Sequence, residues 1–322
     1  MISAFSMASL LTLALPGARM ASPVSPGEDS DWLRRRGEAL GAVRKLIRDR
    51  NTTAASSDHY DVRTDDPRVD ARAVASLLES FRTHFDASWA GLIQLKEYAG
   101  PSPIFLFYSR HKLNQLTADA RREAGTTRVG HYSGGYDFVA LHTDTVAAAE
   151  LPDLMVHEAA HQIIWMRIYG PAALPAPWLM EGLAEYYGNM RRDRDGTWRE
   201  SRIGGKSAAL LHDGPSAGDL RGRSLAAYQR MLRKGETMSL DLLIRIRDPI
   251  DFYGEETLPR YMASWALVHY LMQGDSGRHR SSFAKYLEAE ARGEGGADVL
   301  YELLGMDAAA LDQALAAHAR GM

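Results

Sequence analysis

Hydrophobic and polar residues follow two different periods along the chain, and the change of period divides it into two halves. Before about residue 146, short apolar runs with strand spacing alternate with segments of helical period. Strands are predicted over 59–64, 102–109 and 137–142, and helices over 31–50, 70–88 and 111–123. The glycines between Gly130 and Tyr136 predict a turn before the last strand. This order predicts a small mixed sheet with helices.

From about residue 147 onward the pattern is mainly helical. Helices are predicted over 151–169, 178–190, 239–246, 261–272, 281–291 and 297–317. Three prolines between Gly170 and Pro177 predict a loop, and the polar, glycine-rich stretch 191–224 predicts an irregular excursion. We therefore expect an α+β fold in which a small mixed β-sheet lobe, about 59–146, precedes a mainly helical lobe, about 147–322. The helix at 151–169 would lie between them.

The N-terminal segment has the pattern of a targeting signal. Residues 2–15 are apolar, and small residues with a proline follow up to Ala21. This predicts a signal peptide over 1–21 and an exported protein, periplasmic or secreted; a frayed apolar start is the alternative. Residues 22–58 are predicted to be a linker and an N-terminal helix that could mask a cleft.

Composition excludes several other classes. The 322 residues are 45% hydrophobic and 25% charged, as in an ordinary globular protein. A net charge of -3 lacks the basic excess of a nucleic-acid surface. No apolar run after the first residues is long enough to span a membrane. The absence of cysteine excludes disulfides and a thiolate metal site. The oligomeric state is not indicated.

The candidate chemistry centres on His157-Glu158-Ala-Ala-His161. Histidines four residues apart lie on one face of a helix, where both imidazoles can reach one Zn²⁺ at about 2.0–2.1 Å. Glu158 would lie beside the metal, where a general base for a metal-held water is needed.

A third ligand is predicted in Trp178-Leu-Met-Glu181-Gly-Leu-Ala-Glu185. Glu181 follows His161 after nineteen intervening residues, enough for a loop and a returning helix. Glu185 lies four residues further on the same face, where it could accept a hydrogen bond from a ligand histidine. The alternative is a solvated acidic stripe. The apolar neighbours predict a buried helix, which favours the metal interpretation.

These two segments resemble the gluzincin superfamily of zinc metallopeptidases, to which thermolysin belongs. The second segment is also similar to bacterial proteins of the DUF1570 type, which have a peptidase MA-like pattern. The similarity covers about residues 59–290. It implies a thermolysin-like catalytic domain over 59–322.

The resemblance also implies roles for single residues. The zinc ligands would be His157, His161 and Glu181. Glu158 would be the general base and proton shuttle, and Glu185 would support a ligand histidine. Tyr261, which begins a Tyr-x-x-x-Trp-Ala-Leu helix, resembles the tyrosine that stabilises a tetrahedral oxyanion in related aminopeptidases. A tyrosine that only packs is the alternative.

Two departures narrow the expectation. The Gly-Ala-Met-Glu-Asn signature of those aminopeptidases is absent, which weakens an aminopeptidase assignment. The strand within 130–140 could instead pair with a substrate backbone. Thermolysin's second active-site histidine has no clear equivalent. His212 and His269 qualify by residue type only. His131 and His142 flank the hairpin that the turn at 130–136 and the strand at 137–142 would form, and they could line the cleft.

The expected function is a zinc metallopeptidase that acts on a peptide or protein and has no nucleic-acid partner. A zinc-containing binding or structural module without activity is an alternative, although such a site has no need for Glu158. A non-peptide amide hydrolase acting on cell-wall material is another, because the same zinc chemistry would serve it.

Overall fold

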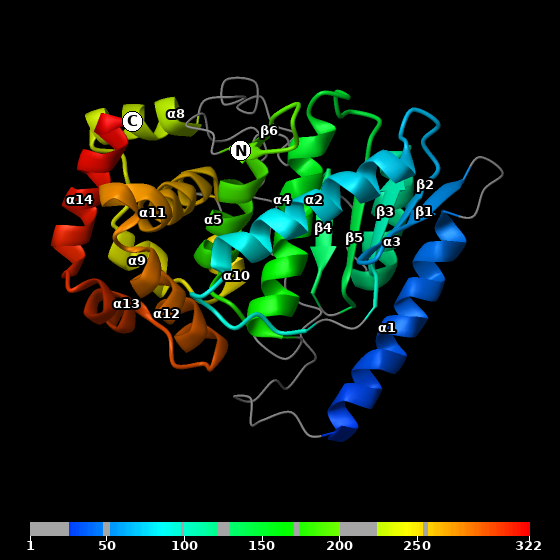
Figure 1. Cartoon of the computed structure of the whole chain (residues 1–322), viewed down its shortest axis with the longest axis horizontal. Helices are drawn as coiled ribbons and strands as arrows, with labels where there is room; N and C mark the ends of the chain where they lie inside the picture. Colours follow the sequence, from blue (N-terminus) through cyan, green and yellow to red (C-terminus); the bar gives the residue numbers. More distant parts are fainter. Residues whose placement is uncertain are drawn as a thin grey trace, which may run out of the picture.

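The computed structural model describes residues 26–47, 52–97, 100–121, 129–134, 136–170, 174–199, 224–253 and 257–322. A small sheet occupies one end of the molecule and a group of helices the other, with α2 and α4 between them (Figure 1). The expected α+β class, with a small mixed sheet followed by a mainly helical region, is confirmed. Within the described ranges, no helix has the length and hydrophobicity needed to cross a membrane.

The sheet has five strands in the order β1-β2-β3-β5-β4. Their bounds are β1 Thr53–Ser56, β2 Tyr60–Thr64, β3 Ser102–Phe107, β4 Gly130–Ser133 and β5 Phe138–His142. The three inner strands are parallel, and each edge strand is antiparallel to its neighbour. Every residue of β3 is buried, as expected for a central parallel strand covered on both faces. The carboxyl ends of β2, β3 and β5 therefore meet at one edge of the sheet.

Helices cover the two faces of this sheet. Because successive side chains of a strand point to opposite faces, Ile104 and Leu106 pack in one cluster and Phe105 and Phe107 in another. The first cluster includes side chains from α2 (Ala71–Trp89) and α4 (Leu151–Ile164); the second includes α1 (Pro26–Leu46) and α3 (Arg110–Arg121). The helix with both motif histidines and the N-terminal helix thus lie on opposite faces.

The helical half is organised around α5 (Pro177–Gly188), which packs between α4 and α11. Every residue of α5 is buried, and apart from the face with Glu181 and Glu185 its side chains are mostly apolar. The other helices are α8 (Ser224–Lys234), α9 (Leu240–Arg245), α10 (Pro249–Phe252), α11 (Thr257–Gly277), α12 (Arg280–Ala291), α13 (Ala297–Leu304) and α14 (Ala308–Gly321). A short hairpin, β6 (Arg191–Arg192) with β7 (Trp198–Arg199), follows α5.

The structure corrects several sequence predictions. The turn predicted within 130–136 is shorter than expected: Gly130–Ser133 is a strand, and the turn lies between it and β5, with the N–H of Asp137 donating to the carbonyl of Ser133 at 2.6 Å. The predicted helix 297–317 is two helices. Gly305 ends the first in a left-handed conformation, and the Asp307 side chain caps the second.

Other elements were not predicted at all. Residues 26–30 form the first turn of α1 rather than a linker. Strand β1 has the sequence Thr-Ala-Ala-Ser, which lacks the apolar alternation that marks a strand. The helices α8 and α10 were also missed; α10 spans only Pro249–Phe252, too short for a helical period to show. Residues 200–223, part of the predicted excursion, lie outside the described ranges.

Candidate metal centre

Helix α4 carries both motif histidines in the interior of the protein. Pro152 lies in its first turn, where a missing N–H breaks no helical hydrogen bond. Asp153 places a carboxylate near the positive end of the helix dipole. Between the two histidines, Ala159 and Ala160 are fully buried, and their small side chains let neighbouring elements approach closely.

The helix continues as one π-helical turn, Trp165–Tyr169, which ends at Gly170 with a positive φ that favours glycine. The N–H of Gly170 donates to the carbonyl of Trp165 at 2.6 Å. The backbone N–H of Lys96 donates to the carbonyl of Arg167 at 2.7 Å, and its ammonium donates to the carbonyl of Tyr169. These bonds satisfy carbonyl groups that a helix end would leave open, and they fix the end of the metal-motif helix.

Three donor atoms converge beside α4. His157 Nε2 and His161 Nε2 are 3.2 Å apart. Glu181 Oε2, from α5, lies 3.7 Å from the first nitrogen and 3.5 Å from the second. This oxygen is buried and makes ion-pair contacts with the histidines but no hydrogen bond. Two imidazole nitrogens and one carboxylate oxygen are a donor set that catalytic zinc sites use with a fourth position open. The three residues could therefore hold a metal ion.

The charges around this group also favour a cation. Burial alone would lower the pKa of His157, but the neighbouring carboxylates Glu185, Glu158 and Glu181 raise it to about 9. Burial alone would raise the pKa of Glu181, but the two histidines hold it at about 2. Three buried carboxylates thus surround two imidazoles, and a divalent ion would offset this excess of negative charge.

Glu185 contacts the ring nitrogen of His157 that lies away from the other two donors. Its Oε1 lies 3.2 Å from His157 Nδ1, the ring nitrogen that points away from Glu181. Asn189, at the end of α5, donates from Nδ2 to Glu185 Oε2 at 3.2 Å and to the Glu185 carbonyl at 2.6 Å. This chain of contacts fixes the ring of His157 and leaves Nε2 as its metal-facing nitrogen. Asn189 had not been singled out in the sequence.

A tyrosine that the sequence did not predict contacts the third donor. Tyr253 donates a hydrogen bond from its hydroxyl to Glu181 Oε1. Tyr261, the predicted oxyanion donor, is also buried, and its ring centroid lies 6.3 Å from that of Tyr253. The two phenols are therefore neighbours. Only proximity in the fold could have identified the first, because it stands outside any motif in the chain.

Glu158 lies against the edge strand β4. A Cβ atom added to Gly130 would lie 2.7 Å from Glu158 Oε1 and 2.9 Å from Leu141 Cδ2. Side-chain carbons do not approach that closely, so only glycine leaves room for the carboxylate in this position. The strand that the sequence singled out for substrate pairing thus runs beside the predicted general base.

The comparison with known families agrees with part of this picture. Residues 153–294 match the family described as "Protein of unknown function (DUF1570)". The matched segment runs from the first turn of α4 to just beyond α12, so it contains the three donors, Glu158 and Tyr253. The DUF1570 part of the predicted resemblance is thereby confirmed. No curated protein matches the chain.

The remaining histidines considered in the sequence lie elsewhere in the fold. His142 is fully buried, and its Nδ1 pairs with an aspartate that follows β5. His131 is half-buried on β4. His269 lies in α11, with Nδ1 3.0 Å from Nε2 of His318 in α14, so it is an interior histidine with a partner. His212 lies outside the described residues.

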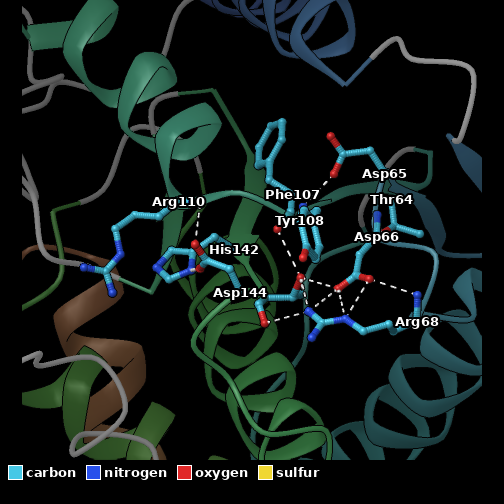
Figure 2. A network of polar contacts seen from close by, with 10 residues as sticks. Thr64, Asp65, Asp66, Arg68, Phe107, Tyr108, Arg110, His142 and Asp144 are labelled. Carbon is cyan, nitrogen blue, oxygen red and sulfur yellow. Dashed lines mark hydrogen bonds and ion pairs between the residues drawn. The ribbon is translucent and has the colours of Figure 1, made fainter.

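A second polar cluster lies at the carboxyl ends of β2, β3 and β5 (Figure 2). Asp66 Oδ2 accepts hydrogen bonds from Arg68 Nη2 at 2.7 Å and Thr143 Oγ1 at 2.5 Å. Asp65 Oδ1 accepts from the N–H of Tyr108 at 2.6 Å. Burial alone would raise the pKa of Asp66, but the bonds from Arg68 and Thr143 lower it. The charged groups of this cluster bind one another and connect the ends of three strands, which accounts for them as contacts that stabilise the fold.

Proposed function

We propose that the protein is a zinc-dependent metallohydrolase that cleaves peptide bonds, and that its two halves form a thermolysin-like catalytic domain. The observation that carries the proposal is the convergence of His157 and His161 of α4 with Glu181 of α5, with Glu158 directly after His157 on α4. Two imidazoles and a carboxylate suit Zn²⁺ better than Mg²⁺ or Ca²⁺, which prefer oxygen donors. Zn²⁺ held there would polarise a carbonyl and lower the pKa of a water toward about 7.

The residues of the chain would then have separate roles. Glu158 takes a proton from the attacking water and passes it to the leaving amine. Glu185 holds His157 in the tautomer that presents Nε2. Tyr261 is the candidate donor to the oxyanion, because a phenol acts where negative charge develops. The edge strand β4 offers backbone groups that could pair with an extended substrate.

The solvent exposure of the three donor residues indicates the side from which a substrate would reach them. The side chain of His161 is 12% exposed, whereas those of His157 and Glu181 are 0% and 3% exposed. A substrate would therefore enter from the side of His161, and the other two ligands are shielded from solvent. A largely buried centre strengthens electrostatic interactions with the reacting groups.

A peptide-library digest tests the proposal. The purified protein, loaded with Zn²⁺, is expected to cleave peptides, and a chelator is expected to stop cleavage reversibly. Glu158→Gln is expected to retain zinc and the fold but lose turnover by at least about 10²-fold, a typical contribution of a positioned base. Glu150→Gln, which makes the same change at the N-cap of α4, is the matched control and should leave turnover unchanged.

Other outcomes decide between the alternatives. Zinc binding without cleavage of any peptide would contradict the peptidase proposal and favour a binding module. Cleavage of cell-wall amides but not of peptides would favour the second alternative. His161→Ala should lose metal, measured as zinc content after dialysis. A protein that holds no metal even before this change would refute the zinc site itself.

We further propose that the protein is exported and acts in the periplasm or outside the cell. The apolar segment before Ala21 supports this, and it lies outside the described residues. Expression of the full chain in a bacterial host, followed by fractionation and intact-mass measurement, tests it. Export should be accompanied by loss of about the first 21 residues; a full-length chain in the cytoplasm would contradict export.

A further inference from the structure

Tyr253 makes contact with the side of Glu181 that does not face the histidines. Its hydroxyl donates to Oε1, while Oε2 of the same carboxylate faces both imidazole Nε2 atoms. Tyr253 is 3% exposed and Glu181 is 2% exposed, so water does not compete freely for this bond. The two oxygens of Glu181 are therefore assigned to different partners.

The backbone around Tyr253 is held in several ways. Asp248 caps α10 by accepting from the N–H of Ile250 at 2.8 Å, and the N–H of Tyr253 donates to the carbonyl of Pro249 at 2.9 Å. Arg260, from α11, donates to the carbonyl of Phe252 at 3.0 Å and to that of the preceding residue. The turn that presents the phenol is thus fixed by contacts within α10 and with α11.

A carboxylate can bind a metal through one oxygen or through both. If both oxygens of Glu181 bound, they would fill the position that a catalytic site leaves open for water or substrate. A phenol that donates to Oε1 occupies one of the two lone pairs of that oxygen and competes with a metal for it. The bond therefore favours binding through Oε2 alone.

We infer that Tyr253 is a positioning residue that restricts Glu181 to one metal-binding oxygen and keeps the fourth coordination position open. This inference rests on the proposed metal site but not on peptidase activity. A purely structural role is the competing explanation, because a buried tyrosine hydroxyl needs a hydrogen-bond partner in any case. A structural role would affect folding stability but would not change the coordination of a bound metal.

Metal affinity is the first measurement. Tyr253→Phe removes one oxygen and keeps the ring. Its affinity for Zn²⁺, measured by competition with a chromophoric chelator, should fall about 10–100-fold, the usual effect of losing a partner of a metal ligand. Tyr301→Phe is the matched control, since Tyr301 also donates from its hydroxyl to a carboxylate, Asp241 Oδ1, at 2.9 Å. That pair joins α13 to α9, and the control should bind zinc as the wild type does.

Coordination is the second measurement. Co²⁺ substituted for Zn²⁺ absorbs visible light strongly in four-coordinate sites and weakly when more ligands bind. The wild-type protein should give the strong spectrum, and Tyr253→Phe should give a weaker one as Oε1 of Glu181 joins the metal. If phenylalanine leaves the protein unfolded by circular dichroism, Tyr253→Met, whose flexible side chain fills similar space, is measured instead.

The outcomes separate this inference from the proposed function. Unchanged zinc affinity and an unchanged Co²⁺ spectrum in a folded Tyr253→Phe would overturn the inference. Equal losses in Tyr253→Phe and Tyr301→Phe would also overturn it, because they would indicate a general effect on the fold. If the wild-type protein binds neither ion, the metal site itself fails. If it binds both but cleaves no peptide, only the peptidase proposal fails.

Discussion

Gly182, next to the third donor, provides a test of how tightly the fold holds the metal group. It lies where α5 crosses α11. A Cβ atom at this position would lie 2.6 Å from the carbonyl oxygen of Ser264 and 2.7 Å from Val268 Cγ2. The first contact is with backbone, which cannot rotate away as a side chain can. Gly182→Ala therefore requires the two helices to separate.

The size of the effect follows from these distances. Raising the 2.6 Å contact to the 3.4 Å of an ordinary contact requires a movement of 0.8 Å. Overpacking of this kind costs about 1–3 kcal/mol, and the better helix propensity of alanine returns about 0.5–1 kcal/mol. The net loss is about 0–2.5 kcal/mol. Metal–ligand distances tolerate only about 0.2 Å, so the same movement at Glu181 should also weaken zinc binding.

Urea unfolding in the presence of a chelator measures the free energy of unfolding without the metal, and chelator competition measures zinc affinity. The matched control is Gly41→Ala in α1, where an added Cβ meets nothing within 4 Å. Alanine should stabilise the protein there by about 0.5–1 kcal/mol, the opposite sign. If Gly182→Ala were as stable as the wild type and bound zinc equally, close packing of α5 on α11 would not position Glu181.

Three further predictions follow from other contacts. Gly130→Ala should displace the carboxylate of Glu158 and lower turnover while zinc content stays unchanged; normal turnover on the peptides that the wild type cleaves would contradict this. Burial lowers the pKa of His318, so the folded state disfavours its protonation. The contribution of His318 to the free energy of unfolding should therefore be complete above the ordinary pKa of about 6.5 and decrease as the pH falls below it. The urea midpoint of His318→Gln should decrease less than that of the wild type between about pH 7.5 and pH 5. Removing zinc with a chelator should lower the thermal midpoint of unfolding, because free zinc at about 100 times its dissociation constant stabilises the folded state by about 2.7 kcal/mol. An equal midpoint with and without the chelator would show that zinc does not bind the folded state in preference to the unfolded one.

The sequence was most informative where local spacing determines geometry. Histidines four residues apart on a helix must lie on one face, so the proximity of His157 and His161 could be predicted. The apolar neighbours of Glu181 and Glu185 predicted a buried helix, and the two carboxylates lie against the histidine pair. A short apolar run likewise predicted β3, and apolar residues at helical spacing predicted α2.

The sequence was least informative where a contact joins distant segments. Tyr253 lies 72 residues from Glu181 and follows a one-turn helix without periodicity. The need for glycine at position 182 depends on the carbonyl of Ser264 in another helix. No spacing rule connects these pairs, because a long loop allows many relative placements of its ends. Tyr261 illustrates the converse: its motif singled it out, and its ring lies beside that of Tyr253, which no motif marks.

The N-terminal helix shows how the fold changes an interpretation of sequence. The sequence left open that the segment 22–58 masks a cleft at the metal group. Helix α1, which makes up much of that segment, instead packs on the sheet face opposite α4. Its Arg36 donates from Nη2 to Asp137 Oδ2 at 2.8 Å, and Gln162 donates to the other oxygen of Asp137 at 2.9 Å. Gln162 directly follows His161 in α4. Asp137 is fully buried in a left-handed turn, so removal of α1 would take a charged partner from it, at a cost of several kcal/mol. Helix α1 is therefore part of the folded core, and through Asp137 it contacts the residue of α4 that follows His161.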